Sequence, residues 1–135
     1  MVYSLTARDE AQKDRILSGG KKAQLFLKNF CKEQFRVGDK LIISYPIDQP
    51  IGAYEVTESR ECSLIEVGVE GARDAGYPMW PSMVEDLRGA YPHVQPDTMV
   101  IFIRWRSIDV PPPRVNSRLF LFYNQIIAYE KEQQN

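Results

Sequence analysis

DRILSGGKKAQLFLKNFCKEQFRVGDKLIISY, residues 14 to 45, is the stretch that decides the fold. Its first residues end a helix, because the glycines at 19 and 20 stop it, and the pair Lys21 and Lys22 then opens a strand. A polar loop leads to a turn at Gly38-Asp39 and to a second strand. Two lysines at a glycine corner can reach an anion. The stretch therefore predicts where a binding site lies, without naming its ligand.

Alternation of apolar and polar residues predicts the strands around this stretch. Residues 23–28 alternate with a period of two, as in a half-buried strand, and the nearly all-apolar run 41–45 is typical of a strand covered on both faces. We expect strands at 2–5, 23–28, 41–45, 51–59, 98–106 and 118–123, and helices at 8–18, 66–75 and 82–90. Short strands interrupted by two or three short helices favour an α+β fold built on a small mixed β-barrel. Leu41, Ile43, Ile101 and Ile103 are its expected core residues.

Composition places the chain among ordinary globular proteins. It has 135 residues, of which 44% are hydrophobic and 26% charged, and this length suits one domain. We expect residues 1–108 to form that domain and residues 109–135, which contain Pro111-Pro112-Pro113, to pack on the barrel or extend it.

The net charge of −1 conceals an uneven distribution of charge. Residues 1–40 hold nine Lys/Arg against five Asp/Glu, residues 41–99 three against ten, and residues 100–135 five against three. If the two ends of the chain meet in space, a basic face lies opposite an acidic one, which favours a polyanionic partner. The alternative is interspersed, solvated charge.

Several classes of protein are excluded or disfavoured. No run approaches the roughly 20 apolar residues of a membrane helix, and the first ten residues contain no apolar segment of a secretory signal, so we expect a cytoplasmic protein. Cys31 and Cys62 are isolated and His93 is the only histidine, so we expect no metal site and no cofactor.

The order of short motifs resembles that of a known family. A helix ends in Ile16-Leu17-Ser18-Gly19-Gly20-Lys21-Lys22 and a polar gap leads to Val37-Gly38-Asp39. The strand around Tyr54-Glu55-Val56-Thr57 follows, then helices ending at Ala72-Arg73-Asp74-Ala75-Gly76-Tyr77 and Ala90-Tyr91-Pro92, then the strand at Val100-Ile101-Phe102-Ile103-Arg104. Over about residues 12 to 106 this order resembles the ASCH domain, the activating-signal-cointegrator homology family of the PUA-like superfamily.

The resemblance implies a PUA-like β-barrel with a cleft beside a Gly-x-Lys corner, usually associated with RNA or modified nucleosides. Some small bacterial members are amidohydrolases of acetylated cytidine that use a Lys, a Thr and a Glu, and others have been linked to RNA cleavage. The family lysine carries over to Lys22, but the residue expected three positions on falls on Leu25, the arginine two further on falls on Leu27, and the helix glutamate falls near Ala75. Because these partners are replaced, we expect no hydrolysis of acetylated cytidine.

The expected binding surface combines cations with rings. Lys21 and Lys22 are candidate anion donors, Phe26 and Tyr45 candidate stacking platforms, and the remaining candidate ligand-binding residues are Lys28, Arg36, Asp74 and Arg104. The alternative is a structural role, in which the rings pack in the barrel and the cations are solvated.

Three functions remain open from sequence. The first is a non-catalytic module that binds RNA or a nucleotide-like anion at the Lys21-Lys22 cleft. The second is a divergent nucleoside amidohydrolase or ribonuclease that uses Lys22 with Asp74 or His93. The third is a protein-interaction or inhibitory accessory module whose partner binds the aromatic segment near the C-terminus, around Leu119 to Tyr123.

Overall fold

The computed structural model describes residues 1–110 and 119–133. They form five strands, four α-helices and one short 3-10 helix. In chain order these are β1 (Val2–Thr6), α1 (Glu10–Ser18), β2 (Ala23–Leu27), η1 (Lys28–Phe30), β3 (Lys40–Ser44), β4 (Pro50–Ser63), α2 (Leu64–Asp74), α3 (Trp80–Ala90), β5 (Met99–Ser107) and α4 (Leu119–Gln133). The expected α+β class is confirmed.

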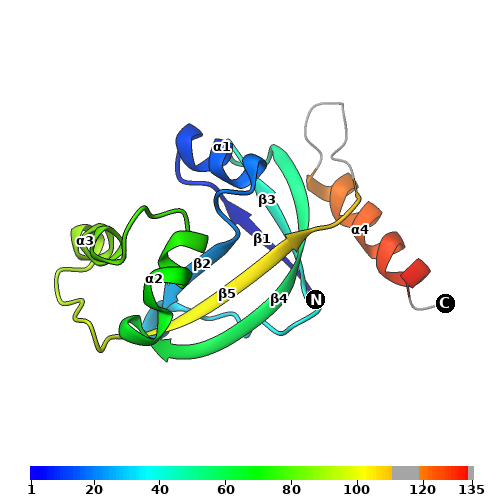
Figure 1. The fold of residues 1–135 in the computed structure, drawn as a ribbon. Helices are drawn as coiled ribbons and strands as arrows, with labels where there is room; N and C mark the ends of the chain where they lie inside the picture. The colour runs from blue at the N-terminus through cyan, green and yellow to red at the C-terminus, as the bar shows by residue number, and fades with distance from the viewer. Residues whose placement is uncertain (111–118, 134–135) are drawn as a thin grey trace.

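The strands form one mixed sheet in the order β1-β3-β4-β5-β2. β1 pairs with β3 in parallel, and the other three neighbouring pairs are antiparallel. The sheet curls into a half-barrel, so β1 and β2 are its two free edges (Figure 1). Phe35, in the loop before β3, lies between these edges, with its ring centroid 4.6 Å from that of Tyr3 on β1 and 5.2 Å from that of Phe26 on β2. The half-barrel is therefore filled at its open side by aromatic packing.

Local sequence explains where the first helices begin and end. α1 starts at Asp9, whose side chain accepts a hydrogen bond from the Gln12 amide, and it ends at Gly19, which takes the left-handed conformation (φ 84°). α2 starts with a capping box, in which Ser63 and Glu66 each bond to the other's backbone amide. The end of α1 at Gly19 places Lys21 and Lys22 in the short link to β2.

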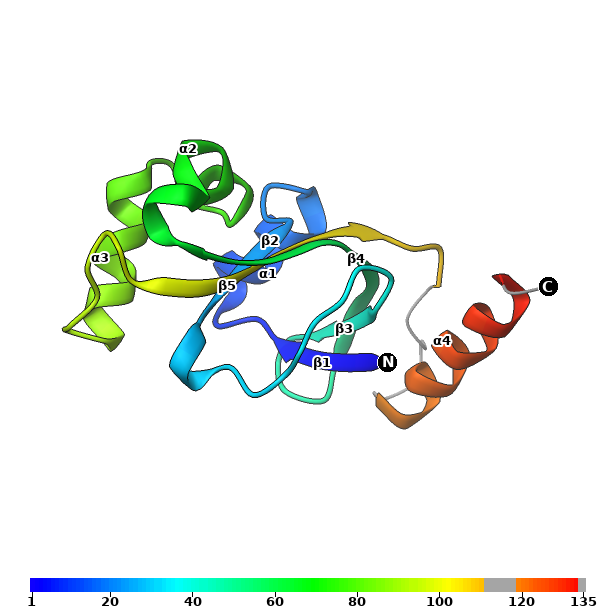
Figure 2. The same cartoon turned by 90° about the horizontal axis from the view of Figure 1, so that it is seen from below.

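Buried side chains gather in three clusters. One lies between the sheet and helices α2 and α3, one inside the half-barrel, and one between the sheet and α4; they are represented by Leu64, Met83 and Phe102, by Leu41, Ile43 and Ile103, and by Ile42, Phe122 and Ile126. Figures 1 and 2 show α2 and α3 at one end of the sheet and α4 at the other. Leu41, Ile43 and Ile103 are core residues as expected, whereas Ile101 is only partly buried.

The expected strand at 118–123 is wrong, because residues from Leu119 onward form α4. Phe122 and Ile126, four residues apart, are both 0% exposed and pack on Ile42 and Ala53 of the sheet, with Tyr129 at the border of the same cluster. This spacing puts them on one face of a helix. The prolines expected to form an extended spacer, at 111–113, lie outside the described residues.

No helix in the described part of the chain combines the length and apolar character that crossing a bilayer requires.

Candidate functional site

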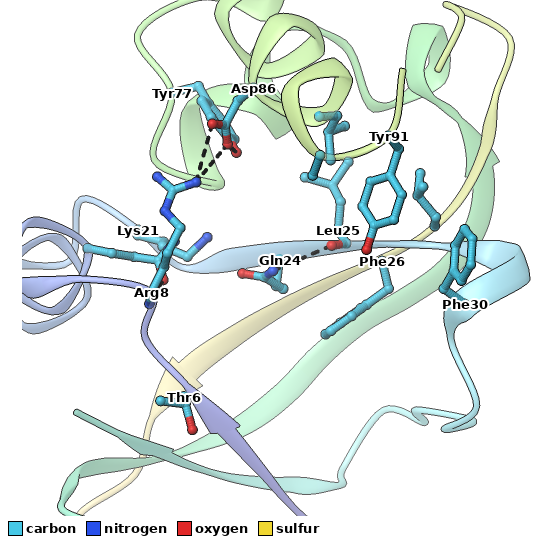
Figure 3. A pocket seen from close by; sticks show the side chains of 14 residues that line it. Thr6, Arg8, Lys21, Gln24, Leu25, Phe26, Phe30, Tyr77, Asp86 and Tyr91 are labelled. Atoms are coloured by element: carbon cyan, nitrogen blue, oxygen red, sulfur yellow. Dashed lines mark hydrogen bonds and ion pairs between the residues drawn. The ribbon is translucent and has the colours of Figure 1, made fainter. Parts of the chain in front are cut away.

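A cleft of about 320 Å³ opens beside the free edge of β2. The start of α1 borders it on one side and α3 on the other (Figure 3). Its lining residues come from β1 to α1, from Lys21 and β2, and from the α3 region: Thr6, Arg8, Gln12, Lys21, Gln24, Leu25, Phe26, Leu27, Phe30, Tyr77, Asp86, Leu87, Ala90 and Tyr91. The cleft is large enough for a nucleoside-sized ligand.

Lys21 is the buried cation of this cleft. It is 5% exposed, and its Nζ donates a hydrogen bond of 3.0 Å to the Ala75 carbonyl at the end of α2. Its own backbone amide bonds to the Arg15 carbonyl, so the turn after Gly19 fixes the side chain's direction. Burial, then the charges of Arg8 and Arg15, lower the pKa of the Lys21 ammonium to about 8.

A network of three side chains forms the wall opposite Lys21. Asp86 on α3 accepts a hydrogen bond of 2.5 Å from the Tyr77 hydroxyl and pairs with Arg8 at 2.9 Å (Figure 3). The bond from Tyr77 is the main cause that lowers the pKa of the Asp86 carboxyl, and burial raises the pKa of Tyr77. The lining of the cleft contains two cations, Arg8 and Lys21, and one carboxylate, Asp86. These side chains therefore give the cleft an excess of positive charge.

The free edge of β2 contributes backbone groups. The Trp105 amide of β5 donates to the Lys22 carbonyl, and Gln24 is paired with Ile103. Because hydrogen-bonding direction alternates along an antiparallel strand, Gln24 and Phe26 point their backbone groups at β5, and Leu25 points its N–H and C=O at the cleft. The Gln24 side-chain Nε2 lies 3.4 Å from the Leu25 carbonyl oxygen. The cleft therefore contains main-chain donors and acceptors as well as charges.

Apolar side chains lie along the rest of the cleft. Phe26 stacks on Phe35 inside the half-barrel, and Leu87 packs from α3 against the cluster on the other face of the sheet. At the far end Phe30 and Tyr91 stack with ring centroids 5.2 Å apart, and they are 67% and 39% exposed. A flat ring placed in the cleft meets apolar surface above and below the plane of the sheet.

Of the candidate residues named from sequence, Lys21 and Phe26 line the cleft. Lys22, one position on, has a side chain that is 56% exposed and lies 3.8 Å from Asp74. Asp74 also accepts a hydrogen bond of 2.8 Å from Arg104, which pairs at the same time with Glu58 at 2.6 Å. Lys22, Asp74 and Arg104 thus form an ion-pair network, and none of the three is among the residues that line the cleft.

The other three candidates also lie elsewhere. Lys28 is exposed and pairs with Glu61 at 3.3 Å. Arg36 is an exposed loop residue, and Tyr45 is partly buried with the Lys13 ammonium 5.9 Å from its ring centroid. His93 borders an adjoining groove that shares Phe30 and Tyr91 with the cleft, but neither His93 nor Lys22 lines the cleft itself.

Sequence reasoning missed Arg8, Gln24, Tyr77 and Asp86. One signal was present for Gln24: Gly19-Gly20-Lys21 satisfies the Gly-x-Lys pattern as well as Gly20-Lys21-Lys22 does, and three residues after Lys21 comes Gln24. If the motif is aligned on Lys21, the position three residues after the lysine is therefore the polar Gln24. If it is aligned on Lys22, that position is Leu25. No local pattern marks Tyr77 and Asp86, because only the tertiary fold brings Asp86, with Tyr77 bonded to it, to Arg8.

The described residues contain no group of three His, Cys, Asp or Glu side chains placed to hold a metal ion. The two cysteines are free: Cys62 is buried and Cys31 partly so.

No protein-family model matches the sequence, and no curated protein matches it. Solved structures do match the fold. The ASCH domain from Lactobacillus crispatus JV V101 has a TM-score of 0.67 at 18% identity over 78% of this chain and 79% of its own. A protein from Enterococcus faecalis V583 gives 0.63 at 14% over 78% and 76%, and an ASCH protein from Zymomonas mobilis gives 0.58 at 12% over 94% and 92%. At these identities the similarity establishes the fold.

Proposed function

We propose that this chain, which has the fold of the ASCH-domain structures, binds a nucleotide or the end of an RNA strand in the cleft around Lys21. The observation that carries the proposal is the meeting of a buried ammonium, a guanidinium, main-chain groups of a sheet edge and apolar side chains in one cleft of about 320 Å³. A nucleotide combines the matching parts, which are an anion, a polar base edge and two flat base faces.

Charge favours an anionic ligand. Lys21 is buried at a cost, which its lowered pKa reflects, and its Nζ has one partner, the neutral Ala75 carbonyl, among the described residues. Arg8 adds a second positive charge, and its side chain is 57% exposed. A phosphate brought between these two groups receives charge-assisted hydrogen bonds and offsets the electrostatic cost of burying Lys21.

Shape favours a planar group beside the anion. The edge of β2 places Leu25 between Leu87 on one face of the sheet and Phe26 on the other. A base stacked on apolar or aromatic surface gains roughly 1–3 kcal/mol. The exposed Phe30–Tyr91 pair at the far end offers a second surface, on which a neighbouring base of an RNA strand can stack.

Adjacent lysines provide a matched test. In Lys21→Met a buried chain of similar length loses its charge inside the cleft, whereas in Lys22→Met an exposed charge outside the cleft is lost. We expect Lys21→Met to weaken binding of a short fluorescein-labelled RNA at least tenfold, since a charge-assisted hydrogen bond contributes about 1.5–3 kcal/mol. Lys22→Met should bind within about twofold of the unchanged protein. Fluorescence anisotropy at low salt measures both.

Circular dichroism melting of both variants establishes that each is folded under the conditions of the binding experiment. Equal loss of affinity in the two variants would indicate diffuse electrostatic attraction, and the cleft would not be the site. Absence of binding by the unchanged protein, to RNA and to mononucleotides alike, would overturn the proposal.

The two rival functions have less support. The amidohydrolase or ribonuclease based on Lys22 requires Asp74 or His93 beside it in a cleft, but the Lys22–Asp74 pair lies outside the cleft and His93 in another groove. The accessory module relies on an exposed C-terminal aromatic segment, whereas Phe122 of that segment is 0% exposed.

A further inference from the structure

We infer that the edge of β2 recognises the imide face of a uracil-like base, in which one ring N–H lies between two carbonyls. The inference rests on the proposed nucleotide binding and adds which base the cleft selects. It starts from Leu25, a residue of the core cluster that is 8% exposed as a whole and lines the cleft on the free edge of β2, where its backbone groups are what it offers to a ligand.

A strand edge recognises a defined pair of groups. In an antiparallel ladder two opposed residues exchange both hydrogen bonds, each N–H donating to the other residue's C=O. The outward Leu25 N–H and C=O can make the same exchange with any planar group that carries a carbonyl next to an N–H. The lactam edge of a nucleobase has this arrangement, and a ring in the plane of the sheet lies between Leu87 and Phe26.

The surrounding side chains select among bases by supplying donors. Gln24 Nε2 lies 3.4 Å from the Leu25 oxygen, and Lys21 and Arg8 are further donors in the same cleft. The one carboxylate in the lining, Asp86, already accepts from Tyr77 and Arg8. The Leu25 carbonyl, an acceptor, is thus surrounded by hydrogen-bond donors, and the one carboxylate nearby is already occupied. The base that complements this arrangement best has one donor flanked by two acceptors.

Uracil presents that complement, because its N3–H lies between the carbonyls at C4 and C2. Cytosine has an unprotonated N3 and an amino group at C4. The acceptor that uracil places opposite the Leu25 N–H is therefore a donor in cytosine, and the donor that uracil places opposite the Leu25 carbonyl is an acceptor. Guanine offers one carbonyl and N1–H, but its amino group then faces the donor side chains. A buried donor or acceptor left without a partner is what makes such sites selective.

Three mononucleotides test the inference on the unchanged protein: UMP, CMP and N3-methyl-UMP. N3-methylation removes the single donor while it preserves the ring, the sugar and the phosphate. By isothermal titration calorimetry we expect UMP to bind at least tenfold more tightly than either of the others. Equal binding of all three would overturn the inference and leave the proposed function standing, as would binding of short RNA but of none of the three, whereas binding of neither RNA nor mononucleotides would overturn both.

Two changes in the protein test the named groups. Incorporation of the α-hydroxy analogue of leucine at position 25 replaces the N–H by an ester oxygen and keeps the buried side chain, and it should weaken UMP at least fivefold. Gln24→Glu exchanges a donor for an acceptor beside Leu25 and should lower the preference for UMP over CMP at least fivefold. Unchanged preference in both proteins would assign the selectivity to a different part of the chain.

Discussion

Two consecutive lysines of this chain experience opposite environments. Lys21 is 5% exposed and bonded to the Ala75 carbonyl, whereas the Lys22 side chain is 56% exposed and lies beside Asp74. The turn that follows Gly19 directs one side chain into the cleft and the other away from it. A charge that remains inside at an energetic cost marks a site where the protein meets another charge or a reacting group.

The buried ammonium gives stability a specific dependence on pH. The folded-state pKa of Lys21 is lowered to about 8 from an ordinary value of 10.5, so above pH 8 the unfolded chain binds more protons than the folded one. Stability then rises with pH, and the contribution of Lys21 gains about 1 kcal/mol between about pH 7 and about pH 9. Cys31 and Cys62 act in the opposite sense as pH approaches 9, because burial raises the pKa of each thiol, and Tyr77, whose pKa burial also raises, does so at higher pH.

Urea unfolding of the unchanged protein, Lys21→Met and Lys22→Met at both pH values measures this contribution. Because the thiols are common to all three proteins, we expect the change in stability between the two pH values to be more favourable by about 1 kcal/mol in the unchanged protein and in Lys22→Met than in Lys21→Met. The same gain in Lys21→Met would show that another group titrates in this range.

At the scale of secondary structure, α4 is the element that differs most from the prediction, because a strand was expected over part of its length. A strand over 118–123 would have apolar residues on both faces. The helix α4 instead directs Phe122 and Ile126 at Ile42 and Ala53. The sequence predicted the strands other than β3 from alternation of apolar and polar residues, which does not match the period of a helix, and β3 from a short apolar run typical of a strand covered on both faces. It failed at α4, because a short apolar run fits both periods, and only the uncovered face of β3 and β4 decides between them.

Neighbouring residues of α4 test how much its docking contributes. Phe122 is 0% and Tyr123 43% exposed. We expect Phe122→Ala to lower the free energy of unfolding by about 3–5 kcal/mol through lost burial and a residual cavity, and Tyr123→Ala by less than about 1 kcal/mol. Chemical denaturation followed by fluorescence measures both, and a Phe122→Ala effect as small as that of Tyr123→Ala would mean that α4 is only loosely attached.

For the candidate site, local pattern indicated the glycine corner and Phe26 but did not distinguish Lys21, which lines the cleft, from Lys22, which does not. Lys21 and Lys22 share the same neighbours in sequence, and their roles separate only when Ala75 and Asp74 arrive from α2. Arg8, Tyr77 and Asp86 come from segments up to 78 positions apart. Such a network follows from tertiary packing, which no short window of sequence contains.

At the scale of the whole molecule, four of the nine cations of the first 40 residues pair with acids of the middle segment. Cations of the first 40 residues meet acids of the middle segment at Arg8–Asp86, Lys22–Asp74, Lys28–Glu61 and Lys40–Glu55. The basic and acidic segments are therefore interleaved at these contacts, and Arg8 and Lys21 bring positive charge to the cleft.

The small number of phosphate contacts in the cleft limits how strongly salt concentration affects RNA affinity. With Lys21 and Arg8 as the phosphate contacts, the logarithm of RNA affinity should fall with the logarithm of salt concentration at a slope of about −1.4, at roughly −0.7 per contact. Lys21→Met should reduce the slope by about one contact, and Lys22→Met should leave it unchanged. Anisotropy titrations at several salt concentrations provide the slopes, and a value near −4 would require a wide basic surface in place of the cleft.

The unpaired edge of β2 has a consequence for how this protein can change over time. The groups that Leu25 offers belong to the peptide unit, which every amino acid except proline carries in full. Mutation of that codon can alter the packing beneath the strand while it leaves the recognition groups in place. Alanine scanning would therefore report only lost packing at this position, and related chains could share the chemistry of this site although their side chains differ there.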